Sequence, residues 1–456
     1  MSSNRAINKM LAIVLILAVI IASVAAAYYY YSTMTVTPTV AKEVTIMNIS
    51  YQDDWYKARV DEFNAAHNGS IHVTLQPLAD YYTQIVTTLT TAPNTVDIVR
   101  TNPGYMAPWA EAGWITTLDD LSGYSGYLSK VEPSRRPELE YNNSHYGLPA
   151  QTGYTAIFLY NKRILEQAGF DHPPATLEEL VSQSQAIKNQ GILQYPLAWH
   201  LKGSERRIDW AWYEFTLMKG GMGLYDENWN ATYLDAGSPG YEGLKFIVDA
   251  IHQYQIMDPA AMEWDTFKVV DLLMKGQAAF VPSDPFQWAT INSATYQEAG
   301  NISQALMLSS HYTWVKSDQM SITKAARDKG QDFLQAAWEV LKWFAGPEKD
   351  QITYHHVLDG LTLYSCYTPI NNDPEVKQLW STQYNTTTMA QQIQYSVSLQ
   401  DFSPAHKTTF YLSWVNDYLI PNLQAAILQT KPIGTALAAI DSGFQSLADE
   451  HGLPPR

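Results

Sequence analysis

Short apolar runs alternate with amphipathic segments from residue 44 onward. Residues 44–49, 71–75 and 96–99 are rich in valine and isoleucine or other apolar side chains, which predicts buried β-strands. Residues 54–67 and 81–91, which lie between these runs, carry apolar side chains at helical spacing. This strand–helix–strand–helix–strand order favours a mostly parallel sheet with helices on both faces. The first part of the chain is therefore predicted to form an α/β lobe.

A connector separates this lobe from a second α/β unit. Residues 147–153 contain two glycines and a proline without a helical period, as expected of a hinge. A β-branched and aromatic strand at 155–160 and a short helix at 162–168 follow. Thr176 is a natural N-cap, and Glu179 completes a capping box at the start of the next helix. The pattern predicts a hinge followed by a second lobe.

Similar elements are predicted along the rest of the chain. We expect a strand at 192–199 and helices at 210–218, 239–254, 265–275, 333–344, 404–428 and 435–451. A length of 456 residues suits two lobes with separate cores better than a single core.

Several sequence blocks carry a resemblance to a known family. Tyr146-Gly-Leu-Pro is followed by Tyr160-Asn-Lys, by Ala168-Gly, and by Pro173-Pro-Ala-Thr-Leu-Glu-Glu-Leu. Further matching blocks lie at 96–121, 219–227, 274–288 and 336–348. In order and spacing these blocks resemble the extracellular solute-binding proteins of ABC importers, in the sugar-binding group related to maltose-binding protein. The resemblance covers roughly residues 44–453.

The resemblance implies an α/β, two-lobed periplasmic-binding-protein-like fold. Each lobe is expected to be a mostly parallel sheet flanked by helices, with three crossings of the chain between the lobes. We assign residues 42–150 and 310–365 to the first lobe, and residues 151–309 and 366–456 to the second. The implied function is that of an extracellular carbohydrate-binding subunit, which captures a mono- or oligosaccharide by lobe closure and delivers it to the permease. The implied partners are the sugar and the transmembrane subunits, and we expect a monomer without a cofactor.

Residues 1–31 have the character of a membrane anchor. Arg5 and Lys9 precede an apolar run at 10–27, which is long enough to cross a bilayer and is followed by tyrosines. The positive charges place the N-terminus in the cytoplasm and the lobes outside. The alternative is a cleaved secretory signal that ends at the three alanines 25–27. We expect a retained anchor followed by a threonine-rich linker at 32–41, and both interpretations export the protein.

Charge and cysteine content narrow the function further. The formal charge of −16 argues against nucleic acid as a partner. The only cysteine, Cys366, excludes an intramolecular disulfide, a cysteine-based zinc site and a lipid anchor directly after the apolar run. Glycosylation sequons, which with the anchor indicate an archaeal glycoprotein, begin at Asn48, Asn68, Asn142, Asn230, Asn301 and Asn385.

Motifs of catalysis are not found in the sequence. It contains no G-x-S-x-G, no P-loop, no H-E-x-x-H and no Cys-His metal spacing. We therefore expect a binding protein that is not an enzyme and holds no metal. Two alternatives stay open. One is a binding protein for peptides or another polar solute, and the other is a surface glycoside hydrolase with two carboxylates facing each other across a cleft.

The candidate ligand contacts follow the ends of predicted strands. In parallel α/β sheets, ligands lie beyond the carboxyl ends of the strands. This rule selects residues 51–55 after the first strand, where Tyr51, Asp53 and Trp55 are the candidates, and residues 100–105 after the third. Within the second range, the resemblance implies ligand contacts at Asn102 and Tyr105. Flat aromatic rings cover the C–H face of a sugar, whereas a charged group such as the Asp53 carboxylate strengthens hydrogen bonds to its hydroxyls.

The second lobe and the crossings supply the remaining candidates, most of them aromatic. Each tryptophan has an alternative role in core packing, because buried tryptophans are common. The resemblance and the positions after predicted strands select Tyr154, Trp199, Trp210, Trp212, Phe286, Trp288, Trp314 and Tyr411.

Overall fold

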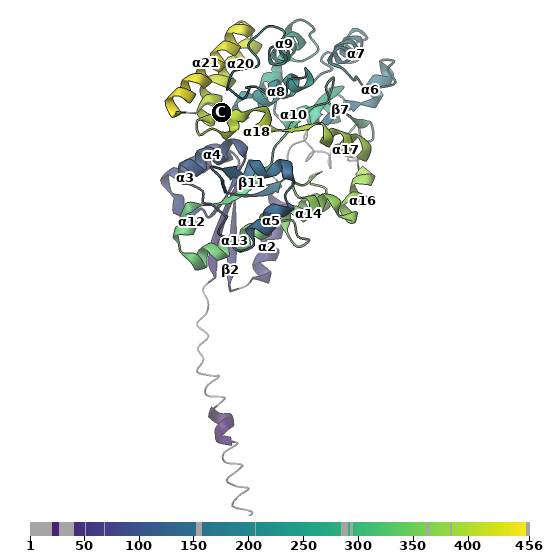
Figure 1. The fold of residues 1–456 in the computed structure, drawn as a ribbon. Coiled ribbons are helices and arrows are strands. Elements are labelled where there is room, and N and C mark those ends of the chain that lie inside the picture. The colour runs from purple at the N-terminus through teal and green to yellow at the C-terminus, as the bar shows by residue number, and fades with distance from the viewer. Residues whose placement is uncertain are drawn as a thin grey trace, which may run out of the picture.

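The chain folds into two lobes, which lie one above the other in Figure 1. The computed structural model describes residues 21–26, 41–50, 52–67, 69–151, 157–205, 207–283, 291, 295–361, 364–383 and 385–452. The two-lobed α/β fold expected from the sequence is confirmed. The lower lobe contains the first predicted unit, and the upper lobe begins after the predicted hinge.

The first lobe is built on a five-stranded sheet of order β2-β1-β3-β11-β6. Strands β1 and β2 are parallel to each other, and β3 is parallel to β1, as predicted. Strand β11 returns from the second lobe and runs antiparallel to both β3 and β6. The strand bounds are Lys42–Ile49 for β1, Ile71–Leu78 for β2, Ile98–Thr101 for β3, Leu148–Gln151 for β6 and Asp318–Ile322 for β11.

Helices cover both faces of this sheet. One face packs against α2 and α13 through buried side chains such as Val60 and Trp338, whereas the other packs against α3 and α4 through Ile85 and Trp109. The apolar spacing of the predicted helices thus identified their buried sides. The helix bounds are Asp53–Ala66 for α2, Tyr81–Thr91 for α3, Pro103–Glu111 for α4, Tyr124–Lys130 for α5, Lys324–Asp328 for α12, Gln331–Ala345 for α13 and Ile352–Leu358 for α14.

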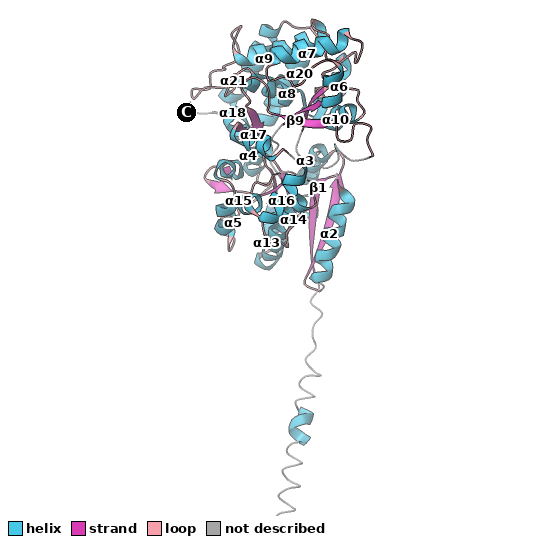
Figure 2. Ribbon diagram, turned by 90° about the vertical axis from the view of Figure 1, so that its right-hand side faces the viewer, coloured by secondary structure: helices cyan, strands magenta, loops and turns pink. Residues whose placement is uncertain are grey.

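The second lobe contains a smaller sheet, which is surrounded by helices (Figure 2). Its strands have the order β8-β7-β9, and β7 pairs antiparallel with both neighbours. The prediction of a mostly parallel sheet is therefore wrong for the described strands of this lobe, because apolar runs mark buried strands without fixing their direction. The predicted strand at 192–199 is reduced to isolated bridges at Leu197. The bounds are Ile157–Asn161 for β7, Phe280–Ser283 for β8 and Ile302–Ala305 for β9.

The helices of the second lobe surround a large core of aromatic and aliphatic side chains. Helix α7 begins as predicted, since the Thr176 hydroxyl accepts a hydrogen bond of 3.1 Å from the backbone N–H of Glu179. The predicted helix at 404–428 is broken into shorter pieces that include a π-helical turn. The bounds are Lys162–Gln167 for α6, Leu177–Asn189 for α7, Arg207–Met218 for α8, Pro239–His252 for α9, Thr266–Met274 for α10, Thr386–Gln394 for α17, Leu399–Phe402 for α18, Tyr411–Trp414 for α19, Ile420–Ile427 for α20 and Ile433–His451 for α21.

Gly243 allows α8 and α9 to pack backbone against backbone. A Cβ atom at this position would lie 2.8 Å from the Thr216 nitrogen. We expect Gly243→Ala to lower the free energy of unfolding by about 1–3 kcal/mol. The added methyl group would meet backbone atoms of α8, which cannot change rotamer to make room as a side chain can. Gly434→Ala is the control, since its Cβ would meet only the Tyr241 ring at 3.8 Å. Denaturant unfolding of the full chain checks the pair, and equal stability of the two variants would contradict the prediction.

The crossing from the second lobe back to the first runs beside a strand from the last third of the chain. Strand β10 (Thr313–Val315) pairs in parallel with β12 (Ser396–Ser398). Helices α15 (Thr368–Asn372) and α16 (Pro374–Gln383) follow α14 on the lower lobe in Figure 2. Ile370 and Val376 pack there with Val131 and Leu139. Residues 366–376 therefore belong to the first lobe, and the predicted boundary at residue 365 lies too early. The spacing of apolar residues could not show this, because it marks the buried side of a helix without showing which lobe covers that side.

The predicted anchor falls almost entirely outside the described residues. Residues 21–26 are helical, and the side chains of Ile21 and Val24 are exposed. Within the described ranges, no helix is long and apolar enough to cross a membrane.

Candidate functional site

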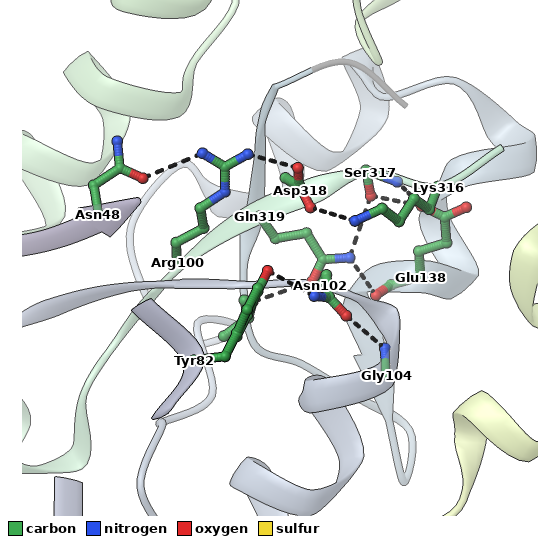
Figure 3. Close-up of polar contacts among 11 residues, drawn as sticks. Asn48, Tyr82, Arg100, Asn102, Gly104, Glu138, Lys316, Ser317, Asp318 and Gln319 are labelled. Carbon is green, nitrogen blue, oxygen red and sulfur yellow. Dashed lines mark hydrogen bonds and ion pairs between the residues drawn. The ribbon is translucent and has the colours of Figure 1, made fainter. Parts of the chain in front are cut away.

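Three charged side chains meet at the edge of the first lobe that faces the second (Figure 3). Arg100 is the residue before the last in strand β3, and its Nη2 lies 2.6 Å from Asp318 Oδ2 at the start of β11. The other carboxylate oxygen of Asp318 accepts from Lys316 Nζ at 3.0 Å. All three side chains are nearly fully buried, with exposed fractions of 3–5%. Because the sheet ends here, the cluster lies where the carboxyl end of β3 reaches the space between the lobes.

The charges of this cluster shift the pKa values of its members. Burial alone would raise the pKa of Asp318, but the charges of Lys316 and Arg100 lower it to about 2. Burial lowers the pKa of Lys316, and the nearby guanidinium groups of Arg100 and Arg207 act in the same direction, whereas Asp318 opposes them. Asp318 is therefore ionised at neutral pH and balances two cations.

A second polar cluster binds the crossing after β10 and the end of β12 to the first lobe. Glu138, in the 3₁₀ segment η2 (Pro133–Leu139), is fully buried. Its carboxylate accepts from the backbone N–H and the hydroxyl of Ser317, at 2.7 and 2.6 Å. It also accepts from Ser398 Oγ at 3.3 Å and from Arg135 Nη1 at 3.3 Å. One carboxylate of the first lobe thus binds both the segment that follows β10 and the last residue of β12.

Aromatic rings form the wall of the first lobe beside these charges. Tyr82 of α3 and Tyr105 of α4 stack with centroids 4.3 Å apart and an interplanar angle of 13°. Asn102 caps α4 by accepting from Gly104 N, and its Nδ2 donates to Tyr82 Oη at 2.8 Å. Burial raises the pKa of Tyr82, so its hydroxyl stays neutral. The cap of α4 therefore orients a tyrosine of the preceding helix.

Trp210 provides a partly exposed ring on the second lobe. The Arg207 guanidinium carbon lies 4.6 Å from its ring centroid, and Lys316 Nζ lies 5.0 Å from the same centroid. Trp314 of β10 is buried, with its ring 5.2 Å from Trp210. Since Lys316 contacts both Asp318 and Trp210, it connects the first lobe to the second.

The lobes touch directly at Gly104 and Tyr411. Tyr411 of α19 is fully buried, and its hydroxyl forms a hydrogen bond with His406 Nε2. A Cβ atom on Gly104 would lie 2.4 Å from Tyr411 Cε1, so the ring rests on the α4 backbone. A cavity of about 470 Å³ lies beside this contact and is lined by residues of both lobes, including Met106, Tyr141 and Gln400.

Comparison with known proteins identifies the family. The family model described as bacterial extracellular solute-binding protein matches residues 49–351. This chain belongs to that family. Among the described residues, no group of three His, Cys, Asp or Glu side chains is arranged to hold a metal ion.

Solved structures with similar folds support the same architecture. Maltose-bound MalE3 of T. maritima has a TM-score of 0.76 and 16% identity, covering 89% of this chain and 99% of its own. A solute-binding protein of Thermotoga lettingae bound to α-D-tagatose has a TM-score of 0.72 and 19% identity, covering 89% and 100%. The GacH receptor of Streptomyces glaucescens, which was solved with acarbose, has a TM-score of 0.72 and 16% identity, covering 90% and 100%. At these identities the likeness shows the fold.

Some predicted contacts of this solute-binding protein come together between the lobes. Asn102, Tyr105, Trp210, Trp314 and Tyr411 line or adjoin the region just described. Tyr51, Tyr154, Phe286 and Trp288 lie outside the described residues.

Other predicted contacts have structural partners elsewhere. Trp199 and Trp212 are fully buried in the core of the second lobe, where they donate to Glu214 Oε2 and to the Gly240 carbonyl, both at 2.8 Å. Asp53 accepts from Ser50 Oγ at 2.6 Å, and Trp55 Nε1 donates to Asp359 at 2.9 Å. These two buried tryptophans therefore pack in the core of the second lobe, which is the alternative role that the sequence left open.

Of the charged residues of the site, the sequence selected only Arg100, as the first residue of the range 100–105, and assigned it no role. Arg100 directly follows the apolar run 96–99, and Lys316 and Asp318 follow the apolar pair Trp314-Val315. A charge at the end of a buried strand is a usable signal, because such a group has to find partners. Nothing in the sequence distinguishes Glu138 from other glutamates, since its partners come from distant segments.

Proposed function

We propose that this protein is the carbohydrate-binding subunit of an ABC importer, capturing a mono- or oligosaccharide between its lobes. The observation that carries the proposal is the meeting of aromatic rings and buried hydrogen-bonding groups from both lobes at the end of β3. Aromatic faces suit sugar C–H groups, and charged donors and acceptors suit sugar hydroxyls. The names of the similar structures, with maltose, tagatose and acarbose, support the same ligand class.

Lobe closure would couple ligand capture to delivery. Tyr82 and Tyr105 belong to the first lobe, whereas Trp210 belongs to the second, so only a closed arrangement offers both walls to one ligand. A ligand that gains contacts in the closed form shifts the equilibrium toward that form. The permease subunits would then recognise the closed protein and accept the sugar.

The proposed location is the extracellular face of the cytoplasmic membrane, with residues 10–27 as a retained anchor or a cleaved signal. Among the proposed glycosylation sites, the side chains of Asn142, Asn230 and Asn385 are exposed and accessible to a transferase. Asn48 is 2% exposed and accepts a hydrogen bond from Arg100, so the folded protein has no room for a glycan there.

Trp210→Ala tests the proposed site. We expect the substitution to weaken sugar binding by about 2 kcal/mol, roughly 30-fold, because a central aromatic contact is lost. Calorimetric titration of the full chain against a panel of mono- and oligosaccharides, with peptides as controls, measures the change. Trp343→Ala is a matched control, since Trp343 is a partly buried tryptophan of α13 that packs on Phe63. Binding of peptides but not sugars would overturn the proposed ligand class.

A further inference from the structure

The cavity of about 470 Å³ beside the contact between Gly104 and Tyr411 has an apolar wall on the first lobe. Met106 and Ala107 of α4 line it, together with Tyr141 of β4 (Glu140–Tyr141), a strand that packs against α4. Ligand sites of proteins typically have volumes of about 300–1,000 Å³. The cavity is therefore large enough for a small ligand that has an apolar face.

The second lobe contributes a buried amide to the same cavity. Gln400 of α18 is 2% exposed, and its Oε1 has no hydrogen-bond partner in the part of the chain that the structure describes. Leaving a buried acceptor unpaired costs about 1–3 kcal/mol. A ligand that donates a hydrogen bond to this oxygen would recover part of that cost, so the cavity favours a ligand with hydroxyl groups.

Charges of both signs line the cavity. Among the described lining residues, Glu140 supplies the one carboxylate, and Lys407 of η6 (Pro404–Lys407) supplies the one ammonium group. Lys407 Nζ also lies 3.5 Å from the Asp401 carboxylate. A charged ligand would be attracted by one of the two lining charges and repelled by the other. The lining therefore suits a neutral polar ligand best.

The cavity adjoins the proposed sugar site through α4 and η6. Pro103, which lines the cavity, directly follows Asn102, whose amide donates to Tyr82 Oη in that site. His406, another lining residue, forms a hydrogen bond with the Tyr411 hydroxyl. A ligand that extends beyond the sugar site along α4 would therefore enter the cavity.

We propose that the cavity is a second subsite, which holds a further unit of the saccharide, so that the protein prefers oligosaccharides to monosaccharides. This inference rests on the proposed function of sugar capture. A neutral sugar unit brings hydroxyl groups for Gln400 and a C–H face for the wall of Met106 and Tyr141. Since α4 and α18 belong to different lobes, a unit held here contacts both lobes and favours the closed form.

The test compares saccharides that differ in length alone. The full chain is titrated by calorimetry with malto-, cello- and xylo-oligosaccharides of one to four units. In at least one series, we expect one added unit to tighten binding about tenfold or more, because that unit gains a hydrogen bond and apolar contacts in the cavity. Equal affinity for all lengths within each series would overturn this inference and leave the proposed function standing. Binding of no saccharide at all would overturn both.

Variants locate the added unit. Gln400→Leu should remove most of the gain in affinity with length and leave the Kd of the shorter saccharide within about twofold, because only the added unit meets this side chain. Gln391→Leu, which replaces an exposed glutamine of α17, is the control and should leave the length dependence unchanged. If Gln400→Leu does not fold, Ala107→Leu gives the same readout by filling part of the cavity. A length dependence that persists in the folded cavity variant would place the added unit elsewhere and overturn the inference.

Discussion

Replacing Asp318 by asparagine is expected to lower the free energy of unfolding by about 3–5 kcal/mol. The substitution keeps the shape of the side chain but removes the negative charge between Arg100 and Lys316, which are both nearly fully buried. Two cations would then lie close together without their shared carboxylate in a region of low dielectric. Denaturant unfolding of the full chain at neutral pH measures the loss.

A surface pair provides the control for Asp318. Asp328 pairs with Lys324 on α12, and both side chains are more than half exposed. Asp328→Asn should change stability by less than about 0.5 kcal/mol, since exposed ion pairs contribute little. A similar small effect of Asp318→Asn would contradict the role assigned to the buried cluster.

The same carboxylate predicts a pH dependence. Its pKa is lowered from 3.8 to about 2 in the folded protein, so the unfolded chain binds the proton more readily. The stabilisation that the ionised Asp318 carboxylate gives to the folded protein is complete well above pH 3.8 and is lost as the pH falls toward 2. It amounts to about 2 kcal/mol. Asp318→Asn should lack this part of the acid sensitivity, which unfolding curves at a series of pH values would show.

The fold of the first lobe could be predicted from the sequence because local signals agreed with one another. Apolar runs at β1 and β3 alternate with helices whose buried faces have a clear period, and that order requires a parallel arrangement. In the second lobe, β8 and β9 pair with β7 over long sequence separations. Their antiparallel direction depends on the path of the connecting segments, which apolar periodicity does not record.

The candidate site was only partly predictable, for a related reason. Strand ends pointed to Asn102 and Tyr105, but the partners that orient them come from other segments, such as Tyr82 on α3. Tryptophans near strand ends could not be sorted by sequence alone. Trp210 and Trp212 lie two residues apart on α8, so they face different directions, and only Trp210 is partly exposed near Lys316.

Gly104→Ala is expected to weaken ligand binding by about 5- to 150-fold without lowering the stability of the separate lobes. The added Cβ would lie 2.4 Å from Tyr411 Cε1 and 3.4 Å from His406 Cδ2, which belong to the second lobe. Overpacking of this kind costs about 1–3 kcal/mol. Because the clash exists only when the lobes touch, the cost falls on the closed form and shifts the equilibrium toward the open one.

Solution scattering and calorimetry together test this account of closure. The Gly104→Ala variant should have a larger radius of gyration than the unmodified protein and a higher Kd for the same sugar. Gly126→Ala is the matched control, because a Cβ at that glycine of α5 would meet no atom within 4 Å. Replacing Tyr411 by alanine in the Gly104→Ala background should restore closure by removing the ring that the new methyl group meets. If Gly104→Ala alone leaves both the radius of gyration and the Kd unchanged, the contact between α4 and α19 does not limit the approach of the lobes.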